Sequence, residues 1–184
     1  ECSPYIMSNL SIADMSHVMT LIQGGVISSS KGRKLLSGLL EVHLQGTENI
    51  PLDPAVGDSY NNRDKYLQQH IGPDSGYVHI GRARREASTI AWQMACREKL
   101  FCLHEKLVQL CEVFNQVVSQ HLNTFMADFT YLQHAQPTTL AHYLQGFQRP
   151  LLRDIGRIET AIKRVNLSPA CSGSVNGSQI EMNR

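Results

Sequence analysis

The sequence has 184 residues, 42% of them apolar, which suits one domain or part of a larger protein with a substantial core. Its 17 Lys and Arg residues nearly balance 16 Asp and Glu residues, which argues against the broad positive field of a protein that binds nucleic acid or an anionic membrane. No apolar run approaches the roughly 20 residues that span a bilayer, and we expect a soluble, cytoplasmic protein.

Two short amphipathic helices are predicted at the beginning of the chain. The first carries an apolar stripe that ends at the glycine pair Gly24-Gly25: Met15, Val18, Met19 and Ile22. The second follows the possible N-caps Ser28 to Ser30, and its stripe precedes Gly46: Leu35, Leu36, Leu39 and Leu40. Residues 46–62 contain prolines and little periodicity, which predicts a connection on the surface. A short helix is expected near Arg63 to His70, before a break at 71–76.

Two long helices are predicted in the second half. Between Arg82 and Gln136 there is neither Gly nor Pro, and apolar residues recur in alternating steps of three and four, as in left-handed helical bundles. The second long helix is expected to start at Pro137 with Thr138 and Thr139, to kink at Pro150 and to end near Val165. The residues after Val165, through Ser178, predict a loop.

These elements predict an all-α fold. We expect a small helical domain in residues 1–75 and the first part of a long-helix bundle in residues 76–184, continuing beyond the chain end. Two long helices cannot close a bundle alone, since each would leave apolar surface in water. Further sequence or other subunits are therefore expected to supply the missing helices.

Three polar segments near the ends of the long helices are candidates for binding or chemistry. In residues 76–86, Arg82, Arg84 and Arg85 suit a dicarboxylate, the alternative being a solvated basic turn. In residues 129–139, hydroxyls and amides can hold a carboxylate, and His134 or Tyr131 can move a proton, the alternative being a capped helix junction. Residues 170–177 indicate an ordinary loop when taken alone.

Other kinds of site are not indicated. The five cysteines lack metal-ligand spacing, and we expect reduced thiols that pack: Cys2, Cys96, Cys102, Cys111 and Cys171. His17 is expected to be packed or exposed rather than functional. The sequence has no HExxH, nucleophile elbow, phosphate-binding P-loop or dinucleotide fingerprint, so we expect no metal and no cofactor.

In order along the chain, these segments resemble the argininosuccinate lyase branch of the aspartase and fumarase superfamily. Residues 77–84, YVHIGRAR, resemble the family's LHTGRSRND, and residues 129–139, FTYLQHAQPTT, resemble its YTHLQxAQPTT. Residues 169–184 resemble PLGSGALAGxxxPIDR, and residues 14–17 are similar to the family's SxAH helix. The resemblance spans nearly the whole chain, and LQHAQPTT is its most specific part.

The resemblance implies an all-helical bundle that assembles as a homotetramer, with each active site drawn from three subunits. It implies a β-elimination that breaks a C–N bond through an aci-carboxylate intermediate and releases fumarate. It assigns catalysis to Tyr131 and Thr130. It assigns substrate binding to these residues: His79, Arg82, Arg84, Arg85, Gln133 and Ser172.

The sequence departs from the family pattern at positions that bear on the substrate. Tyr131 stands where the family has His, and a phenol is a poorer proton shuttle at neutral pH than an imidazole. Ile80 replaces Thr, Ala83 replaces Ser and Arg85 replaces Asn, which suggests a substrate other than argininosuccinate itself. The family's loop GSSxMPxKxNP, which carries the serine base, has no counterpart here and is expected beyond Arg184 or in a companion chain.

Three hypotheses follow from the resemblance and its departures. The leading one is a lyase that acts on an argininosuccinate-like, N-substituted aspartate. The second is a non-catalytic paralogue that keeps the helical scaffold, and the third is a superfamily lyase with a different leaving group in a specialised pathway. All three predict no nucleic-acid or membrane partner.

Overall fold

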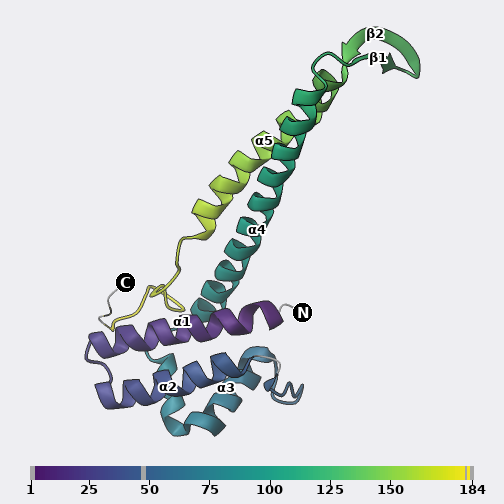
Figure 1. The fold of residues 1–184 in the computed structure, drawn as a ribbon. Helices are drawn as coiled ribbons and strands as arrows, with labels where there is room; N and C mark the ends of the chain where they lie inside the picture. Colours follow the sequence, from purple (N-terminus) through teal and green to yellow (C-terminus); the bar gives the residue numbers. More distant parts are fainter. Residues whose placement is uncertain (1–2, 47–48, 181, 183–184) are drawn as a thin grey trace. The chain divides into compact units, whose positions relative to one another are not determined.

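The computed structural model describes residues 3–46, 49–180 and 182 of the chain. Along the sequence its main elements are α1 (Ser3–Gln23), α2 (Ser29–Gln45), α3 (Ser59–Ile71), the 3-10 helix η2 (Pro73–His79), α4 (Arg84–Gln120), β1 (Phe125–Thr130), β2 (Gln133–Thr139) and α5 (Leu140–Val165) (Figure 1). The predicted helical fold is confirmed, with the addition of one β-hairpin. Among the described residues, no helix is both long enough and apolar enough to cross a membrane.

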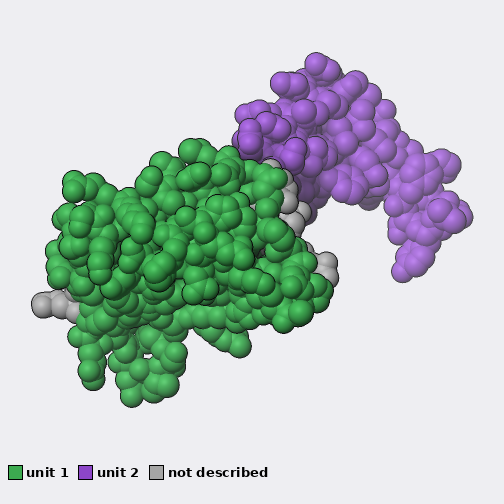
Figure 2. Space-filling view, turned by 90° about the horizontal axis from the view of Figure 1, so that it is seen from below, with its two compact units in different colours: residues 1–96, 167–184 green, residues 97–166 purple. Residues whose placement is uncertain are grey.

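The chain forms two compact units, which Figure 2 distinguishes by colour. The first, here called the N-terminal unit, comprises residues 1–96 and 167–184, and the second, the two-helix unit, comprises residues 97–166. Helix α4 contributes residues to both. These units divide the chain differently from the boundary predicted between residues 75 and 76, which stays a prediction.

The N-terminal unit has a continuous apolar core. Its fully buried side chains come from α1, α2, α3 and η2: Val18, Leu21, Leu35, Leu39, Leu67 and Val78. Two glycines on α2 bring the helices close together, because a Cβ at Gly32 would lie 2.3 Å from Ile22 and one at Gly38 would lie 2.5 Å from Ile71. Of the predicted leucine stripe of α2, Leu35 and Leu39 are buried and Leu36 packs against this core, whereas Leu40 is 46% exposed.

The caps of α2 and α3 explain where these helices begin. Ser28 accepts a hydrogen bond from the backbone N–H of Lys31, as predicted for one of the three serines. Helix α3 begins at Ser59, earlier than expected, because Asp58 caps it through the N–H of Asn61. Asn62 is buried and donates to the carbonyls of Asp53, Gly57 and Asp58, which ties the preceding connection to the helix.

The prediction of one helix through residue 136 is wrong. Helix α4 ends at Gln120, and β1 pairs with β2 in an antiparallel hairpin whose register joins Phe125 to Thr139 and Thr130 to Gln133. A lack of Gly and Pro does not exclude a turn here, because Tyr131 and Leu132 themselves adopt positive φ angles of 50° and 62°. Two-residue hairpin turns of this kind usually carry Asn or Gly, and neither residue is present at positions 131 and 132 to indicate a turn.

The start of α5 also differs from the prediction. Pro137 lies in β2 opposite Ala127, and Thr139 is the N-cap, accepting a hydrogen bond from the N–H of His142 at 3.2 Å. Proline is tolerated at that position because a two-stranded sheet has only edge strands. The helix then runs through Pro150 to Val165.

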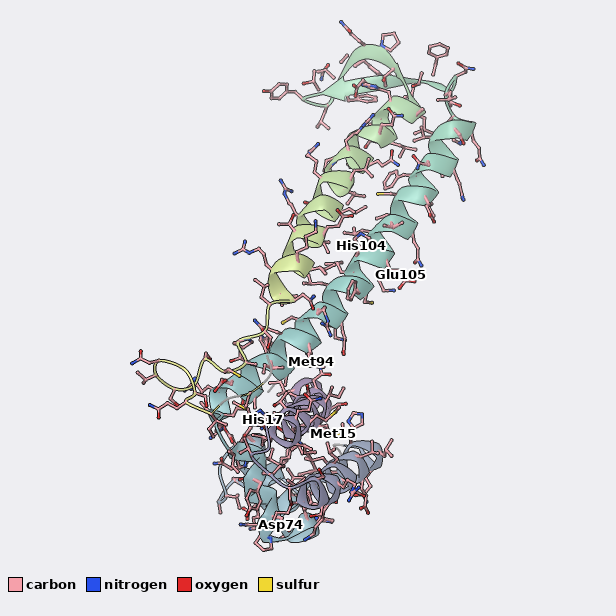
Figure 3. The ribbon with its side chains drawn as sticks, turned by 90° about the vertical axis from the view of Figure 1, so that its left-hand side faces the viewer. Met15, His17, Asp74, Met94, His104 and Glu105 are labelled. Carbon is pink, nitrogen blue, oxygen red and sulfur yellow. The ribbon has the colours of Figure 1, made fainter. Side chains whose placement is uncertain are left out.

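Helices α4 and α5 lie side by side in the two-helix unit (Figures 1 and 3). The buried Gln148 of α5 joins them by donating to the Cys111 carbonyl at 3.0 Å and to Asn115 at 2.7 Å. Large apolar side chains of this unit remain exposed: Phe101, Leu103, Leu110, Val113, Phe147 and Leu152. Among them, Leu103, Leu110 and Phe147 belong to the apolar stripes predicted for the two long helices, so these stripes are open in part among the described residues.

The four cysteines that the structure describes do not form a common site. Cys96, Cys102, Cys111 and Cys171 are free; Cys111 is buried and packs as expected, whereas Cys102 is exposed. Cys2 lies outside the described residues. Within those residues, no group of three or more His, Cys, Asp or Glu side chains is arranged to hold a metal ion.

Candidate active site

A cavity of about 560 Å³ opens beside the first turns of α4. Its lining comes from α1, from the residue that caps α3, and above all from α4: Ile6, Asp58, Arg84, Arg85, Ser88, Thr89 and Trp92. Two of the three arginines of the first polar segment thus meet in one hollow. We call this hollow the arginine cavity.

Arg84 is held in place by its neighbours on and before α3. One of its terminal nitrogens pairs with the Asp58 carboxylate, and the other donates to the side-chain oxygen of Asn61 at 3.2 Å. The guanidinium also lies 4.8 Å from the centre of the Tyr60 ring. Arg84 and Asp58 are both about half exposed, so an incoming carboxylate can replace Asp58 at small cost.

The charge of Asp58 is maintained by the same contacts. Partial burial favours the neutral acid, but hydrogen bonds from the N–H of Asn61 and from Arg84, with the charge of Arg84, lower its pKa below the usual value. At neutral pH the pair is therefore ionic, and Asp58 compensates one of the two positive charges in the arginine cavity.

Arg82 takes a different position from its two neighbours in sequence. Its side chain is only 4% exposed and pairs with the carboxylate of Asp14, which also accepts from Arg63 at 2.6 Å. Ser11 accepts a further hydrogen bond from Arg63 at 3.1 Å. The guanidinium of Arg82 thus closes a buried ion-pair cluster, and its predicted role in binding substrate stays a prediction.

Sequence reasoning did not single out the partners of Arg82. Asp14 follows Leu10 by four residues and precedes Val18 by four, so the helical period already places it on the buried face of α1. A carboxylate on a buried face needs buried cations as partners. The position of Asp14 was therefore the signal in the sequence that could have predicted its ion pairs. Arg63 offers no comparable signal, because its position depends on how α3 packs.

A buried carboxylate fixes the start of α4 and so the direction of its arginines. Glu86 is 4% exposed and accepts a hydrogen bond from the N–H of Ala83 at 2.7 Å. This is the reciprocal half of a capping box, in which the third helical residue reaches back to the N-cap. It secures the helix end although Ala83 has no side-chain oxygen of its own.

His79 supports the site indirectly. Its Nε2 donates to Asp64 at 2.7 Å, and its Nδ1 lies 3.4 Å from the hydroxyl of Tyr60, the ring beneath Arg84. The hydrogen bond from His79 lowers the pKa of Asp64. Among the described residues that line the arginine cavity, His79 is absent, so its predicted contact with substrate stays a prediction.

The second polar segment forms the tip of the hairpin in the two-helix unit. Thr130 and Gln133 are paired across the turn, and Tyr131 and Leu132 are 96% and 94% exposed. His134 packs against Phe129, with ring centres 4.9 Å apart. Thr130, Tyr131 and Gln133 therefore lie together at one exposed turn, and both turn residues adopt backbone conformations that are costly for side chains of their kind.

The third polar segment folds back on itself in the N-terminal unit. Ser172 donates its N–H to the Pro169 carbonyl at 3.2 Å, and its own carbonyl accepts from Gly177 at 2.8 Å. Cys171 lines a second cavity of about 220 Å³ together with Arg82 and His17. Ser172 does not line it, and its predicted contact with substrate stays a prediction.

His17, labelled in Figure 3, lies on α1 and donates from Nε2 to the carbonyl of Ile80 at 2.8 Å. Burial lowers its pKa, and the positive charge of Arg82 lowers it further. The imidazole is therefore neutral at physiological pH and holds the segment that leads into α4.

Comparison with known proteins gives a consistent result. The model of a family described as Lyase matches residues 13–184. The argininosuccinate lyase of Methanocaldococcus jannaschii is 32% identical, over 94% of this chain and 36% of that protein, and the one of Methanosarcina acetivorans is 34% identical, over 100% and 37%. The chain thus spans little more than a third of the length of these curated relatives.

Solved structures show the same likeness. A crystal structure of EDDS lyase in complex with formate has a TM-score of 0.86 and 26% identity, covering 98% of this chain and 35% of that one. A class II fumarase from Schistosoma mansoni has a TM-score of 0.82 and 16% identity, covering 95% of this chain and 41% of that one. At that identity the fumarase shows the fold alone.

Proposed function

This chain belongs to the lyase family whose model matches residues 13–184, and from that premise we propose that the protein is a C–N lyase. Its substrate is an argininosuccinate-like, N-substituted aspartate, and its products are fumarate and an amine. Relatives named argininosuccinate lyase and a neighbour of known structure named EDDS lyase support this proposal. So does a variant of EDDS lyase whose structure contains fumarate.

The observation that carries the proposal is the arginine cavity. The motif that resembles the family's GRSRND segment places Arg84 and Arg85 side by side in sequence at the start of α4, and both line one cavity. Guanidinium groups bind carboxylates through paired N–H donors, and the substrate carries at least two carboxylates. Asp58, Asn61 and Tyr60 hold Arg84 ready for such a ligand.

The reaction requires charge stabilisation and proton transfer. A base removes the proton from the carbon beside one carboxylate, and negative charge collects on that carboxylate, where cations and hydrogen-bond donors lower the barrier. The freed electron pair forms the double bond of fumarate, the C–N bond breaks, and the amine leaves with a proton. Arg84 binds one carboxylate, while the hydroxyl of Thr130 and the amide of Gln133, contributed by another subunit, hold the other.

Two groups transfer protons in this proposal, an acid in the hairpin and a serine base. Tyr131, at the hairpin tip beside Thr130, donates a proton or a hydrogen bond to the leaving nitrogen. The base is a serine on a loop like GSSxMPxKxNP, outside residues 1–184. A strained and exposed turn suits a group that must enter a site built from several segments.

The proposal includes assembly into a homotetramer in the cytoplasm, with active sites shared between subunits. Its support is the set of large apolar side chains that the two-helix unit leaves exposed, such as Phe101, which is 54% exposed, and Phe147, which is 53% exposed. Exposed apolar surface of this kind is typical of helices that pack against other subunits. Light scattering on the purified complete protein would measure the assembly.

The test is fumarate release by the complete polypeptide from a panel of N-substituted aspartates. We expect turnover of at least one member and a loss of kcat/KM on the order of a hundredfold in Arg84→Gln, because a charge-assisted hydrogen bond to substrate is lost. Arg33→Gln, at an exposed position on α2, is the matched control and should retain full activity. Silence of the wild-type protein across the panel would count against the proposal.

A second candidate, a non-catalytic scaffold, is favoured by one observation, the Tyr131 that replaces the family's His. Replacement of Tyr131 by Phe and by His separates the two functions. Under the enzymatic proposal, Tyr131→Phe lowers kcat and Tyr131→His retains activity. Unchanged turnover in Tyr131→Phe would exclude the phenol as an acid, and a complete protein that binds no dicarboxylate would favour the scaffold.

A further inference from the structure

The charges in the arginine cavity do not cancel. Arg84 is paired with Asp58 and Asn61, whereas Arg85 is exposed and has no hydrogen-bond or ion-pair partner among the described residues. The cavity therefore has one compensated and one uncompensated guanidinium. The proposed carboxylate contact of Arg84 does not account for this second, uncompensated guanidinium in the arginine cavity.

The two guanidinium groups leave the helix in different directions. Consecutive residues of an α-helix differ by about 100° around its axis, so Arg84 and Arg85 do not project to the same side. Arg84 points to the cap of α3, where Asp58 and Asn61 hold it. Arg85 shares its face of α4 with residues three, four and seven positions later: Ser88, Thr89 and Trp92.

The part of the cavity around Arg85 has a mixed chemical character. Ser88 and Thr89, which lie on the same face of α4 as Arg85, contribute two hydroxyl groups to the lining of the cavity. The half-exposed indole of Trp92 and the aliphatic side chain of Ile6 also line it. Such a lining fits a ligand with an anionic head on a short apolar body. Because Arg84 and the hairpin groups are assigned to the carboxylates of the aspartate part, the remaining part of the substrate is the amine.

We infer that Arg85 is a specificity-determining residue, which selects substrates whose amine leaving group carries an anionic group of its own. The inference rests on the proposed lyase function and names the class of its substrate. Arg85 forms a charge-assisted, two-point hydrogen bond with that group, while the apolar body lies along Trp92. Leaving groups that are neutral or cationic at this position lack the partner and are cleaved more slowly.

The experiment compares the cleavage of two substrates of the same shape by the complete protein. One is N-(2-carboxyethyl)aspartate, and in the other the carboxylate of the carboxyethyl group, which belongs to the leaving amine, is replaced by a primary amide. We expect the wild-type protein to prefer the acid by about ten- to a hundredfold in kcat/KM, the range of one charge-assisted hydrogen bond. Arg85→Gln removes the charge and should abolish this preference, with a larger fall in kcat/KM for the acid than for the amide. Arg85→Lys should retain part of the preference, and Arg33→Gln should retain all of it.

The outcomes separate this inference from the proposed function. Fumarate released from both substrates, with no preference in the wild type or with the same preference in Arg85→Gln, would overturn the inference and leave the lyase function intact. Equal loss of both activities in Arg85→Gln would also overturn it, because Arg85 would then act on the aspartate part. Fumarate from neither substrate, nor from any other N-substituted aspartate, would overturn both.

Discussion

The two compact units of this chain obtain their stability in different ways. In the N-terminal unit, Leu35 and Leu39 are completely buried, and even the charged Asp14 is enclosed by two arginines. In the two-helix unit, Phe101 and Leu110 remain 54% and 43% exposed. The first unit therefore closes its own core, whereas the second leaves large apolar side chains accessible, which is the surface that the proposed homotetramer would cover.

The largest effect on the free energy of unfolding is expected from Asp14→Asn in the N-terminal unit. The substitution leaves Arg63 and Arg82 buried without a counter-ion, and breaking a buried pair in this way costs about 3–5 kcal/mol. Urea unfolding followed by circular dichroism measures the loss. Asp74→Asn is the control, because Asp74 forms an exposed pair with Lys34 at 2.9 Å and its loss should hardly change the midpoint. Equal effects of the two variants would contradict the buried cluster.

Truncation of one leucine in each unit tests the comparison directly. Leu39→Ala removes a fully buried side chain and should cost about 2–5 kcal/mol, whereas Leu110→Ala should cost less than about 1 kcal/mol in this chain alone. If the proposed homotetramer forms, the cost of Leu110→Ala should rise in the complete protein, because partner helices would cover this side chain. A cost that stays small after assembly would show that Leu110 faces solvent throughout.

The hairpin turn is the next place to test. Leu132 has φ 62°, a conformation that costs a non-glycine residue about 1–2 kcal/mol. Leu132→Gly should therefore stabilise the hairpin by about 1 kcal/mol, measured as slower amide hydrogen exchange in β1 and β2. Leu122→Gly, which introduces glycine near the end of α4, is not expected to slow exchange. No change in Leu132→Gly would mean that the native turn carries no strain.

The same turn shows how far the sequence could predict this structure. Helical periodicity and capping residues located α2, α5 and the end of α1 within a few residues, because those signals are local, whereas α1 begins at Ser3, well before the predicted stripe that starts at Met15. The hairpin was missed because Tyr131 and Leu132 are not turn formers, and their conformation depends on the pairing of β1 with β2.

The candidate site was predicted in part for a similar reason. The sequence identified all three arginines but could not distinguish them, since their different surroundings arise only when the N-terminal helices pack. Arg82 is committed to Asp14, Arg84 is paired with Asp58, and Arg85 is without a partner among the described residues. The periodic burial of Asp14 was the one local sign that an arginine would be taken into the core.

The smallest effect on stability is expected from the titration of His17. Burial and the neighbouring Arg82 lower its pKa in the folded state, so the unfolded chain binds a proton at a higher pH than the folded chain does. The stability that this neutral imidazole contributes is present above about pH 6.5 and is lost as the pH falls through the lowered pKa. The urea midpoint of the N-terminal unit should therefore decrease between about pH 7.5 and 5.5.

Two variants test this assignment. His17→Gln keeps an N–H donor for the carbonyl of Ile80 but cannot titrate, so its urea midpoint should decrease less over the same pH range. His70→Gln, at an exposed position on α3, is the control and should follow the wild type. If His17→Gln follows the wild type as well, other groups control the acid sensitivity of this unit.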